Sequence, residues 1–278
     1  MSRLNGARLT GTADAAWRGD FGRALRAEWT KLRTAGEAGR LLLLVIVLTV
    51  AVGCGTAKAV KCPDAGCGQD AAKLTLSGVT VGQAVIAVLA VLAVSGEYGT
   101  GMIRTTLTAV PNRITVLTAK ATILTTVVLA AGTAAVLASL LAGRCLLPGS
   151  GFTGAHGYAP LSLADGPTLR AAVGSVLYLV LVALLGLGVA TAVRDAASAI
   201  GIVLGLLYLF PVVTRVVNDP EWQRHLQQIS PMTAGLAIQA TVHLRRLPIG
   251  PWAGLGVLAT WAAAALLVGS VLLHRRDA

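Results

Sequence analysis

Charged residues are scarce in this sequence and are missing from long stretches of it. Only 13% of the 278 residues are Asp, Glu, Lys or Arg, about half the share that is usual in a soluble domain. In contrast, 55% are hydrophobic and the mean hydropathy is +0.74. The few charges gather between long apolar blocks. This distribution excludes an ordinary soluble domain and predicts a protein embedded in a membrane.

Six blocks without a charged residue follow one another along the chain. A helix needs about 20 apolar residues to cross the hydrocarbon layer. Five blocks reach or approach this length, whereas the first has 17 residues and needs snorkelling basic side chains at its ends. Their small residues suit closely packed helices rather than barrel strands, which predicts an all-α integral membrane protein with six transmembrane helices. The blocks are Leu41–Ala57, Leu74–Gly96, Ala121–Gly143, Ala171–Val193, Ala196–Thr214 and Leu247–Leu273.

Basic residues lie mostly on one side of the predicted bundle. If the N-terminus is in the cytoplasm, 14 of the 23 Lys and Arg residues fall in cytoplasmic segments, as the positive-inside rule requires. We therefore expect an N-in, C-in topology in a multi-pass protein of a cell membrane. The same bias accounts for the net charge of +11, so membrane lipids, and not nucleic acid, are the expected partners of the basic surface.

The predicted helices also lack the groups that carry chemistry at membrane depth. No Asp, Glu, Lys, Arg or His lies within the six blocks, although ion-coupled carriers and intramembrane proteases depend on such groups. The GxGxxG spacing at Gly149–Gly154 has no strand before it, and no Gly-Lys pair forms a phosphate-binding loop. We therefore expect no enzyme activity, no metal and no cofactor on this chain. GxxxG spacings at Gly201–Gly205 and Gly250–Gly254 predict close helix packing.

The segment before the first block has two parts. Residues 1–20 show no apolar periodicity and predict a flexible cytoplasmic tail, which leaves residues 21–278 as a single six-helix domain. Apolar residues then recur at nearly helical spacing, with basic residues on the remaining face. This pattern favours an amphipathic helix in the membrane interface, and a soluble amphipathic helix is the alternative. The proposed interface residues are Phe21, Leu25, Trp29 and Leu32.

The four cysteines fall at or beyond the outer surface in this topology. Because disulfides form in oxidising compartments, Cys62 and Cys67 in the first outer loop are candidates for a bridge. Free thiols remain an alternative. Metal binding is less favoured, because no histidine lies near the two cysteines.

The inner loop between the second and third blocks is polar, rich in glycine and ends in a proline turn. A short helix over about residues 101–109 would expose Arg104, Thr105 and Thr108 to the cytosol. Such a protrusion suits docking of a soluble partner, and a plain connecting loop is the alternative.

Three segments of the sequence resemble permeases of the type-2 exporter class of ABC transporters, particularly actinobacterial ones. The inner loop is similar to their cytoplasmic signature, the N-terminal segment to their amphipathic elbow helix, and the last outer loop to their outer helical hairpin. Two departures occur: Met102 stands where threonine is usual, and Gly99-Thr100 replace a basic residue. The resembling segments are Glu97-Tyr98, Gly101–Leu107, Pro111–Arg113, Ala119-Lys120, Leu25–Arg33, and Trp222, Leu226, Pro231 and Ala234–Ile238.

The resemblance implies a function for the inner loop. It would form the coupling helix that docks on a separate ATP-binding subunit, which would hold ATP and Mg²⁺. The chain would be a permease subunit in a bacterial plasma membrane, working with a second permease copy or a paralogue. The substrate stays open, since uncharged helices suit amphiphilic or apolar cargo but also simply suit lipid. A non-transporting membrane scaffold or an immunity-type membrane protein is the alternative. The implied coupling residues are Glu97, Gly101, Arg104, Thr105, Pro111 and Arg113.

Overall fold

The chain is an all-α membrane protein in the computed structural model, which describes residues 3–34, 36–62, 67–99 and 112–275 and, of these, the side chains of all but 3–18, 98 and 99. No strand occurs in this part of the chain, and six helical segments are long and apolar enough to cross a membrane. The prediction of six transmembrane helices is thereby confirmed. The segments are α2 (Gly36–Ala59), α3 (Ala71–Leu76) with α4 (Val79–Gly99), α6 (Arg113–Leu146), α7 (Gly166–Val193), α8 (Ala196–Val216) and α11 (Pro251–Arg275).

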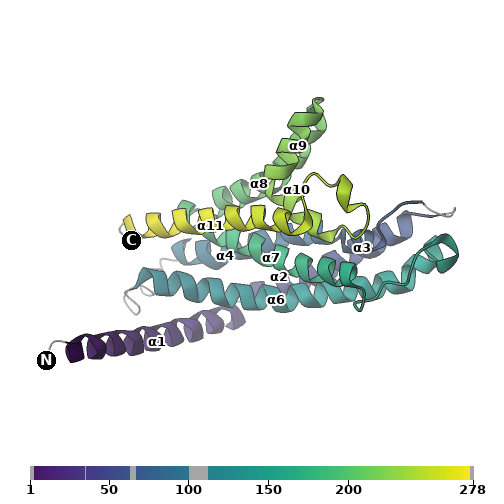
Figure 1. Cartoon of the computed structure of the whole chain (residues 1–278). Coiled ribbons are helices and arrows are strands. Elements are labelled where there is room, and N and C mark those ends of the chain that lie inside the picture. The colour runs from purple at the N-terminus through teal and green to yellow at the C-terminus, as the bar shows by residue number, and fades with distance from the viewer. Residues whose placement is uncertain (1–2, 35, 63–66, 100–111, 276–278) are drawn as a thin grey trace.

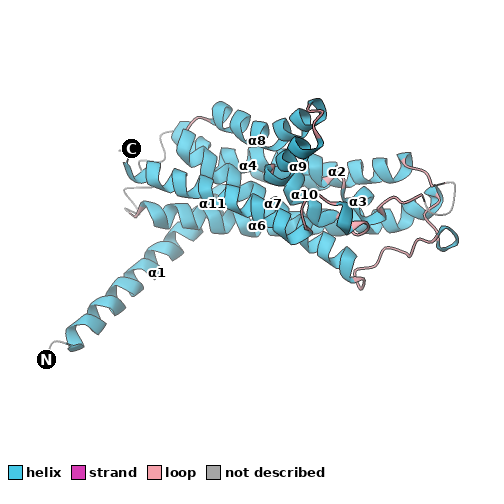
Figure 2. Ribbon diagram, turned by 45° about the horizontal axis from the view of Figure 1, so that its top comes forward, coloured by secondary structure: helices cyan, strands magenta, loops and turns pink. Residues whose placement is uncertain are grey.

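Three further α-helices occur in the described part of the chain. Helix α1 (Arg3–Thr34) precedes them, and its first half points away from the bundle (Figures 1 and 2). Helices α9 (Pro220–Ile229) and α10 (Pro231–Leu236) connect α8 to α11. Because α1 begins at Arg3, it is longer than the amphipathic helix predicted over residues 21–33. That residues 1–20 form a flexible tail in solution stays a prediction, because helical structure from Arg3 does not measure mobility.

Both ends of the chain lie at the same end of the bundle (Figure 1), as an even number of crossings requires. Arg113 at the start of α6 donates a hydrogen bond of 2.5 Å to the carbonyl oxygen of Leu273 in α11, which ties the third crossing to the sixth. We call this the terminal end and the opposite end, where Cys62 and Cys67 lie, the disulfide end. That the terminal end faces the cytoplasm stays a prediction from the distribution of basic residues.

The first crossing is longer than its uncharged block. Helix α2 has 24 residues, about 36 Å at the rise of an α-helix, which is longer than the hydrocarbon layer. Its uncharged part is only about 25 Å long, so the expectation that Arg40 and Lys58 snorkel at its edges stays a prediction. The block of 17 residues began after Arg40 because it was bounded by charge, whereas the helix continues through Arg40 to Gly36.

The second crossing is broken near the disulfide end. Helix α3 ends at Leu76 and α4 begins at Val79. Gly78 lies in the break, where a Cβ atom would collide with the carbonyl oxygen of Thr49 in α2. The break therefore lets two backbones approach at a point that admits no side chain.

Helix α7 forms the centre of the bundle, and most of its side chains are buried. Small residues bring its neighbours close. Gly186 faces Ala87 and Ala90 of α4, and Gly188 lies against the backbone of α11 at Ala265. Close approach through small residues is how helices gain packing energy in a membrane.

Helix α8 packs differently from what its GxxxG spacing predicts. Gly201 and Gly205 face open space, so the prediction of close packing there within this chain is wrong. The helix lies at the edge of the bundle and buries Ala199, Val203 and Leu207, a row four residues apart on another face. The Gly250–Gly254 prediction is confirmed for Gly254, which fits against the carbonyl of Ala234 in α10, and is wrong for Gly250, which faces open space just before α11 begins.

The segment between α9 and α11 turns into the bundle at the disulfide end. Helix α9 stands out from the bundle (Figure 1), whereas α10 and the 3₁₀ turn Ala237–Gln239 are buried. Gly235 lies against the ring of Tyr178, and Ile238 lies against Gly174 of α7. The apolar stretch 232–242 therefore packs within the bundle and does not cross it.

Candidate functional site

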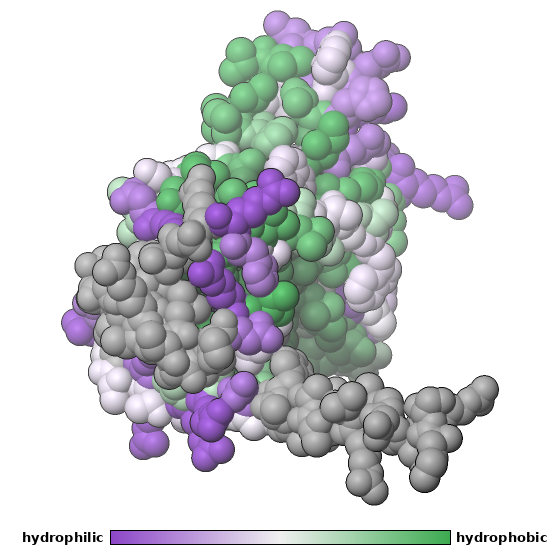
Figure 3. Space-filling view, turned by 90° about the vertical axis from the view of Figure 1, so that its left-hand side faces the viewer, coloured by the Kyte–Doolittle hydropathy of each residue, from purple (hydrophilic) through white to green (hydrophobic). Residues whose placement is uncertain are grey.

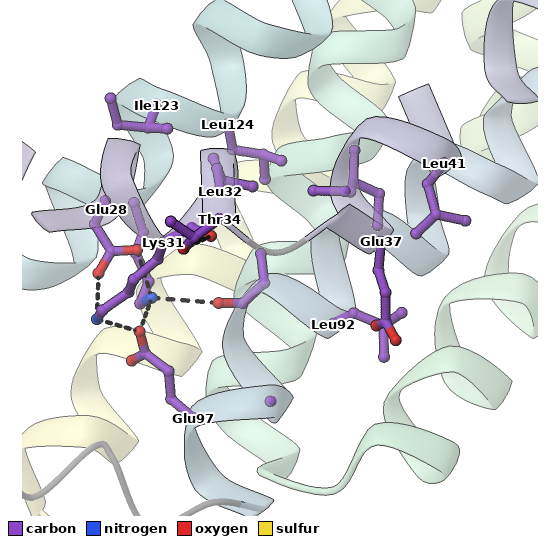
Figure 4. Close-up of a pocket in the computed structure, with 15 residues that line it drawn as sticks. Glu28, Lys31, Leu32, Thr34, Glu37, Leu41, Leu92, Glu97, Ile123 and Leu124 are labelled. Carbon is purple, nitrogen blue, oxygen red and sulfur yellow. Dashed lines mark hydrogen bonds and ion pairs between the residues drawn. The ribbon is translucent and has the colours of Figure 1, made fainter. Parts of the chain in front are cut away.

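Four charged side chains from three helices meet at the terminal end of the bundle. The ammonium of Lys120 in α6 contacts Glu28 Oε2 and Glu97 Oε1 at 2.7 Å each. Lys31 Nζ lies 3.0 Å from Glu28 Oε1 and 2.6 Å from Glu97 Oε1. Figure 4 shows these contacts as dashed lines. We call these four residues the charge cluster; it joins α1 to α4 and α6.

Three of the four residues of the charge cluster are almost closed to solvent, and the Lys31 side chain is 29% exposed. Glu28, Glu97 and Lys120 are 7%, 6% and 6% exposed, and the Lys120 ammonium also donates to the carbonyl oxygen of Ala93. Buried charges are tolerated only when they are paired and hydrogen-bonded. Two carboxylates facing two ammonium groups supply the pairing, so each group depends on its partners, and Glu97 Oε2 is the one carboxylate oxygen of the cluster without a hydrogen bond among the described residues.

Apolar contacts hold the second half of α1 in place beside the charge cluster. Ala24 is buried with Val116 and Ala119 of α6, and Phe21 and Leu25 pack against this group. Since 21, 24, 25 and 28 lie on one face of a helix, the same face supplies the apolar contact and the Glu28 carboxylate. Hydrophilic side chains otherwise gather around this end of the molecule (Figure 3).

Helix α6 starts at a defined position relative to the charge cluster. The Asn112 side chain accepts hydrogen bonds from the backbone N–H groups of Ile114 and Thr115, which is the usual N-cap arrangement. This cap fixes the first turn of α6, two turns before Lys120.

The electrostatics of Lys31 follow from its surroundings in α1. Burial alone would lower its pKa, because desolvation disfavours the ammonium form. The hydrogen bond to Glu97 and the negative charges of Glu28 and Glu97 outweigh this effect, so the pKa of Lys31 is raised above its ordinary value. Lys31 is therefore cationic at neutral pH and remains an ion-pair partner.

The predicted coupling residues divide into two groups. Glu97 lies in the charge cluster and Arg113 at the start of α6, where it donates to Leu273. Because the Glu97 side chain is turned into the bundle, its contacts there position helices, and its contact with a partner protein stays a prediction. The other four residues lie outside the described residues: Gly101, Arg104, Thr105 and Pro111.

The proposed interface residues of α1 have unequal surroundings. Phe21, Leu25 and Leu32 are partly buried against the bundle, whereas Trp29 is 50% exposed. Three of the four thus dock α1 on its own chain, and only Trp29 presents a free aromatic surface of the kind that sits at head-group depth. Its depth in a bilayer stays a prediction.

Sequence reasoning missed three members of the charge cluster, although the spacing carried a signal. Glu28 lies three residues after Leu25 and four before Leu32, so all three residues fall on one face of the helix. Lys120 lies between Val116 and Leu124 at intervals of four, and both neighbours are buried. A charged residue on the apolar face of a helix indicates a buried pair. The uncharged blocks contain no ionisable group, but Glu97 and Lys120 lie just beyond them, where α4 and α6 reach the terminal end of the bundle.

A cavity of about 410 Å³ adjoins the charge cluster, between α1, α2, α4 and α6. In Figure 4 Glu28, Lys31 and Glu97 lie on one side of it, and Leu41 and Leu92 lie on the other. Glu37 also lies on this second side, so the charge cluster forms one wall and the other wall is aliphatic apart from Glu37.

The disulfide end is held together in another way. Cys62 and Cys67 are joined by a disulfide, and the hydroxyl of Tyr158 lies 3.2 Å from Cys67 Sγ. Cys54 and Cys145 are free. Within the described ranges no group of three or more His, Cys, Asp and Glu side chains is placed to hold a metal ion.

A scan against models of protein families and a search of curated proteins give no match for this chain.

Proposed function

We propose that this chain is the transmembrane permease subunit of an ABC-type, ATP-driven exporter of a bacterial plasma membrane. It would work as a dimer with a second permease copy or a paralogue, and with two ATP-binding subunits that hold ATP and Mg²⁺. The six apolar helices are compatible with a membrane transport subunit. The finer assignment rests on the resemblance of three sequence segments to this class.

One structural observation supports the proposal more than any other. The charge cluster takes Glu28 and Lys31 from the elbow-like segment, Glu97 from the first position of the signature-like segment and Lys120 from its last. These positions are up to 92 residues apart. Segments that resemble one family for independent reasons therefore meet in a single buried site.

The charge cluster suggests how a motor protein would move this bundle. Residues 100–111 connect α4 to α6, and Glu97 and Lys120 lie on the two helices that flank this segment. Movement imposed on the segment by a partner would act on α4 and α6 together and, through the buried ion pairs, on α1. In this mechanism the cluster transmits motion and performs no chemistry.

Copurification tests the proposal. The affinity-tagged full-length chain is purified in mild detergent from its native membranes, and a nucleotide-binding subunit with ATPase activity is expected to copurify. The variant Arg104→Glu with Arg113→Glu should abolish both copurification and ATPase activity, because charge reversal opposes docking. Arg245→Glu with Arg246→Glu is the matched control, since both residues are exposed at the other end of the chain's bundle.

Arg104→Glu alone separates docking from structure, because Arg113 also holds α11 through Leu273. Loss of the partner in this single variant, with unchanged thermal stability, supports docking. If the charge-reversed double variant retains the ATPase, or no nucleotide-binding protein copurifies with the unmodified chain, the proposal is wrong and the membrane-scaffold alternative takes its place.

A further inference from the structure

We propose that the cavity beside the charge cluster binds an amphiphile with an N–H-bearing ammonium head group and an aliphatic chain. Its volume of about 410 Å³ lies within the range of small-molecule sites, roughly 300–1,000 Å³. The proposal concerns a site between α1 and the crossings, and it does not rest on the exporter function.

The head group is indicated by an unsatisfied acceptor. Glu97 lines the cavity and is 6% exposed. Its Oε1 atom accepts from Lys31 and Lys120, whereas Oε2 has no hydrogen-bond partner among the described residues. A buried polar atom without a partner carries a free-energy penalty. A ligand that donates an N–H group to this oxygen would remove the penalty.

The charge of the cavity wall favours a cation over an anion. Three carboxylates line the cavity, those of Glu28, Glu37 and Glu97, against two ammonium groups, those of Lys31 and Lys120. Both ammonium groups already pair with carboxylates. The charge cluster is thus neutral by itself, and the one negative charge in excess is that of Glu37, an exposed residue on the far side of the cavity (Figure 4). The lining as a whole therefore favours a cation over an anion.

The rest of the wall fits an aliphatic chain. The apolar lining side chains come from all four surrounding helices, and Leu92 is 37% exposed, so the apolar side of the cavity reaches the surface of the bundle. A chain can enter from the lipid side while its head group remains at the charge cluster. These side chains are Leu32, Leu41, Leu89, Leu92, Ile123 and Leu124.

Three probes with the same twelve-carbon chain test the head group. Dodecylammonium, dodecyltrimethylammonium and dodecyl sulfate are added separately to the full-length chain in phosphatidylcholine nanodiscs, and bound copies are counted by native mass spectrometry. We expect one dodecylammonium per chain. Binding of the trimethyl analogue, which has no N–H donor, should be at least tenfold weaker, and the sulfate should not bind at this site.

Two matched substitutions test the location. Leu92→Trp fills the cavity without touching the ion pairs, and Leu129→Trp adds the same bulk on α6 at a position that is equally 37% exposed but does not line the cavity. Leu92→Trp should weaken dodecylammonium binding at least tenfold, and Leu129→Trp should leave it unchanged. Equal binding by the two variants, or equal binding of all three probes, would overturn the proposal.

A further experiment, in which the lipid composition of the nanodiscs is changed, identifies the source of the ammonium group. Phosphatidylethanolamine has an N–H-bearing ammonium and phosphatidylcholine does not. If replacing part of the phosphatidylcholine by phosphatidylethanolamine displaces dodecylammonium, the site takes a membrane lipid. If dodecylammonium stays bound, the site takes a free aliphatic amine.

Discussion

The two ends of the bundle are held together by different chemistry. At the terminal end, α1, α4 and α6 meet through the ion pairs of the charge cluster, and a cavity lies beside them. At the disulfide end, a covalent bond joins Cys62 to Cys67. The backbone N–H of Cys62 also donates to the carbonyl oxygen of Ser150 at 2.9 Å.

The difference indicates which end is able to rearrange. Ion pairs between separate helices can exchange partners, and a cavity leaves room for side chains to move. A disulfide and backbone hydrogen bonds fix loops in one arrangement. We therefore expect conformational change to concentrate at the terminal end, with the disulfide end as the rigid reference, and the following predictions test this contrast.

The largest effect is expected for Lys120→Met. This change removes the ammonium that Glu28 and Glu97 share and leaves two buried carboxylates with Lys31 as their partner. Removing one partner of a buried pair lowers the free energy of unfolding by about 3–5 kcal/mol. Thermal denaturation of the detergent-solubilised chain measures this loss.

A distance measurement shows which helices separate when Lys120 is replaced by methionine. Spin labels at the exposed positions Arg26 and Ile114 report the separation of α1 and α6, in a background where Cys54 and Cys145 are serine. The separation should increase in the methionine variant. It should return toward the original value when Glu28 is also changed to glutamine, because Glu97 then pairs with Lys31 and no carboxylate is left in excess. An unchanged separation would show that the ion pairs do not hold α1.

At the opposite end, Cys62→Ser with Cys67→Ser should have a smaller and local effect. The bridge closes a loop with a sequence separation of 5, for which the chain-entropy model gives roughly 2 kcal/mol of stability. We expect denaturation at a lower temperature and an unchanged α1–α6 separation. A reductant should shift the original chain and leave the serine variant unaffected. Release of α1 by reduction would show that the two ends are not independent.

A still smaller effect is expected for Asp70→Ala. The Asp70 carboxylate accepts hydrogen bonds from the backbone N–H groups of Lys73, Thr241 and Val242, and from the Thr241 hydroxyl. It thereby caps α3 and ties it to the segment before α11. Because these donors lie near the surface, the loss should be about 1–2 kcal/mol.

Hydrogen–deuterium exchange locates the effect of this change. Exchange should accelerate over residues 240–247 and stay unchanged over the second half of α1. Asp70→Asn keeps one acceptor oxygen and should have a weaker effect. Equal exchange in the alanine variant and the original chain would mean that Asp70 does not fix this segment.

The crossings were predictable because a transmembrane helix depends on the average hydrophobicity of a stretch of sequence and not on any particular residue. A run of about 20 apolar residues suffices to predict a crossing, and six of these were found. The charge cluster was not predictable in this way. Each block was defined to end at the first charged residue, so a charged residue that is buried beside a crossing was counted as part of a loop. Lys120 and Glu28 are 92 residues apart, and only the folded chain shows that they are partners.

The sequence predicted that helices pack closely through small residues, but it did not predict which glycines make these contacts. A GxxxG spacing predicts a close helix contact, yet Gly201 and Gly205 face open space while Gly188, outside any such motif that was recognised, lies against α11. The spacing describes one helix, and the contact depends on which face a neighbouring helix meets. The position of α8 at the edge of the bundle decides this, and it follows from the whole arrangement.

The smallest effect concerns pH and isolates Lys31 within the charge cluster. Its neighbours there are Glu28 on its own helix, Glu97 on α4 and Lys120 on α6. Because the pKa of Lys31 is raised in the folded chain, its contribution to stability is fully present below the ordinary lysine value of about 10.4 and is lost as the pH rises through the folded value.

The α1–α6 separation should therefore stay constant from about pH 6 to pH 9 and increase only above about pH 10.4. The change should be slight, since the Lys31 side chain is 29% exposed and water already screens part of its charge. Lys31→Arg provides the control, because arginine remains charged at higher pH, and it should move the onset upward. An onset near neutral pH, or one that arginine does not move, would mean that Lys31 does not contribute to holding α1 at the terminal end.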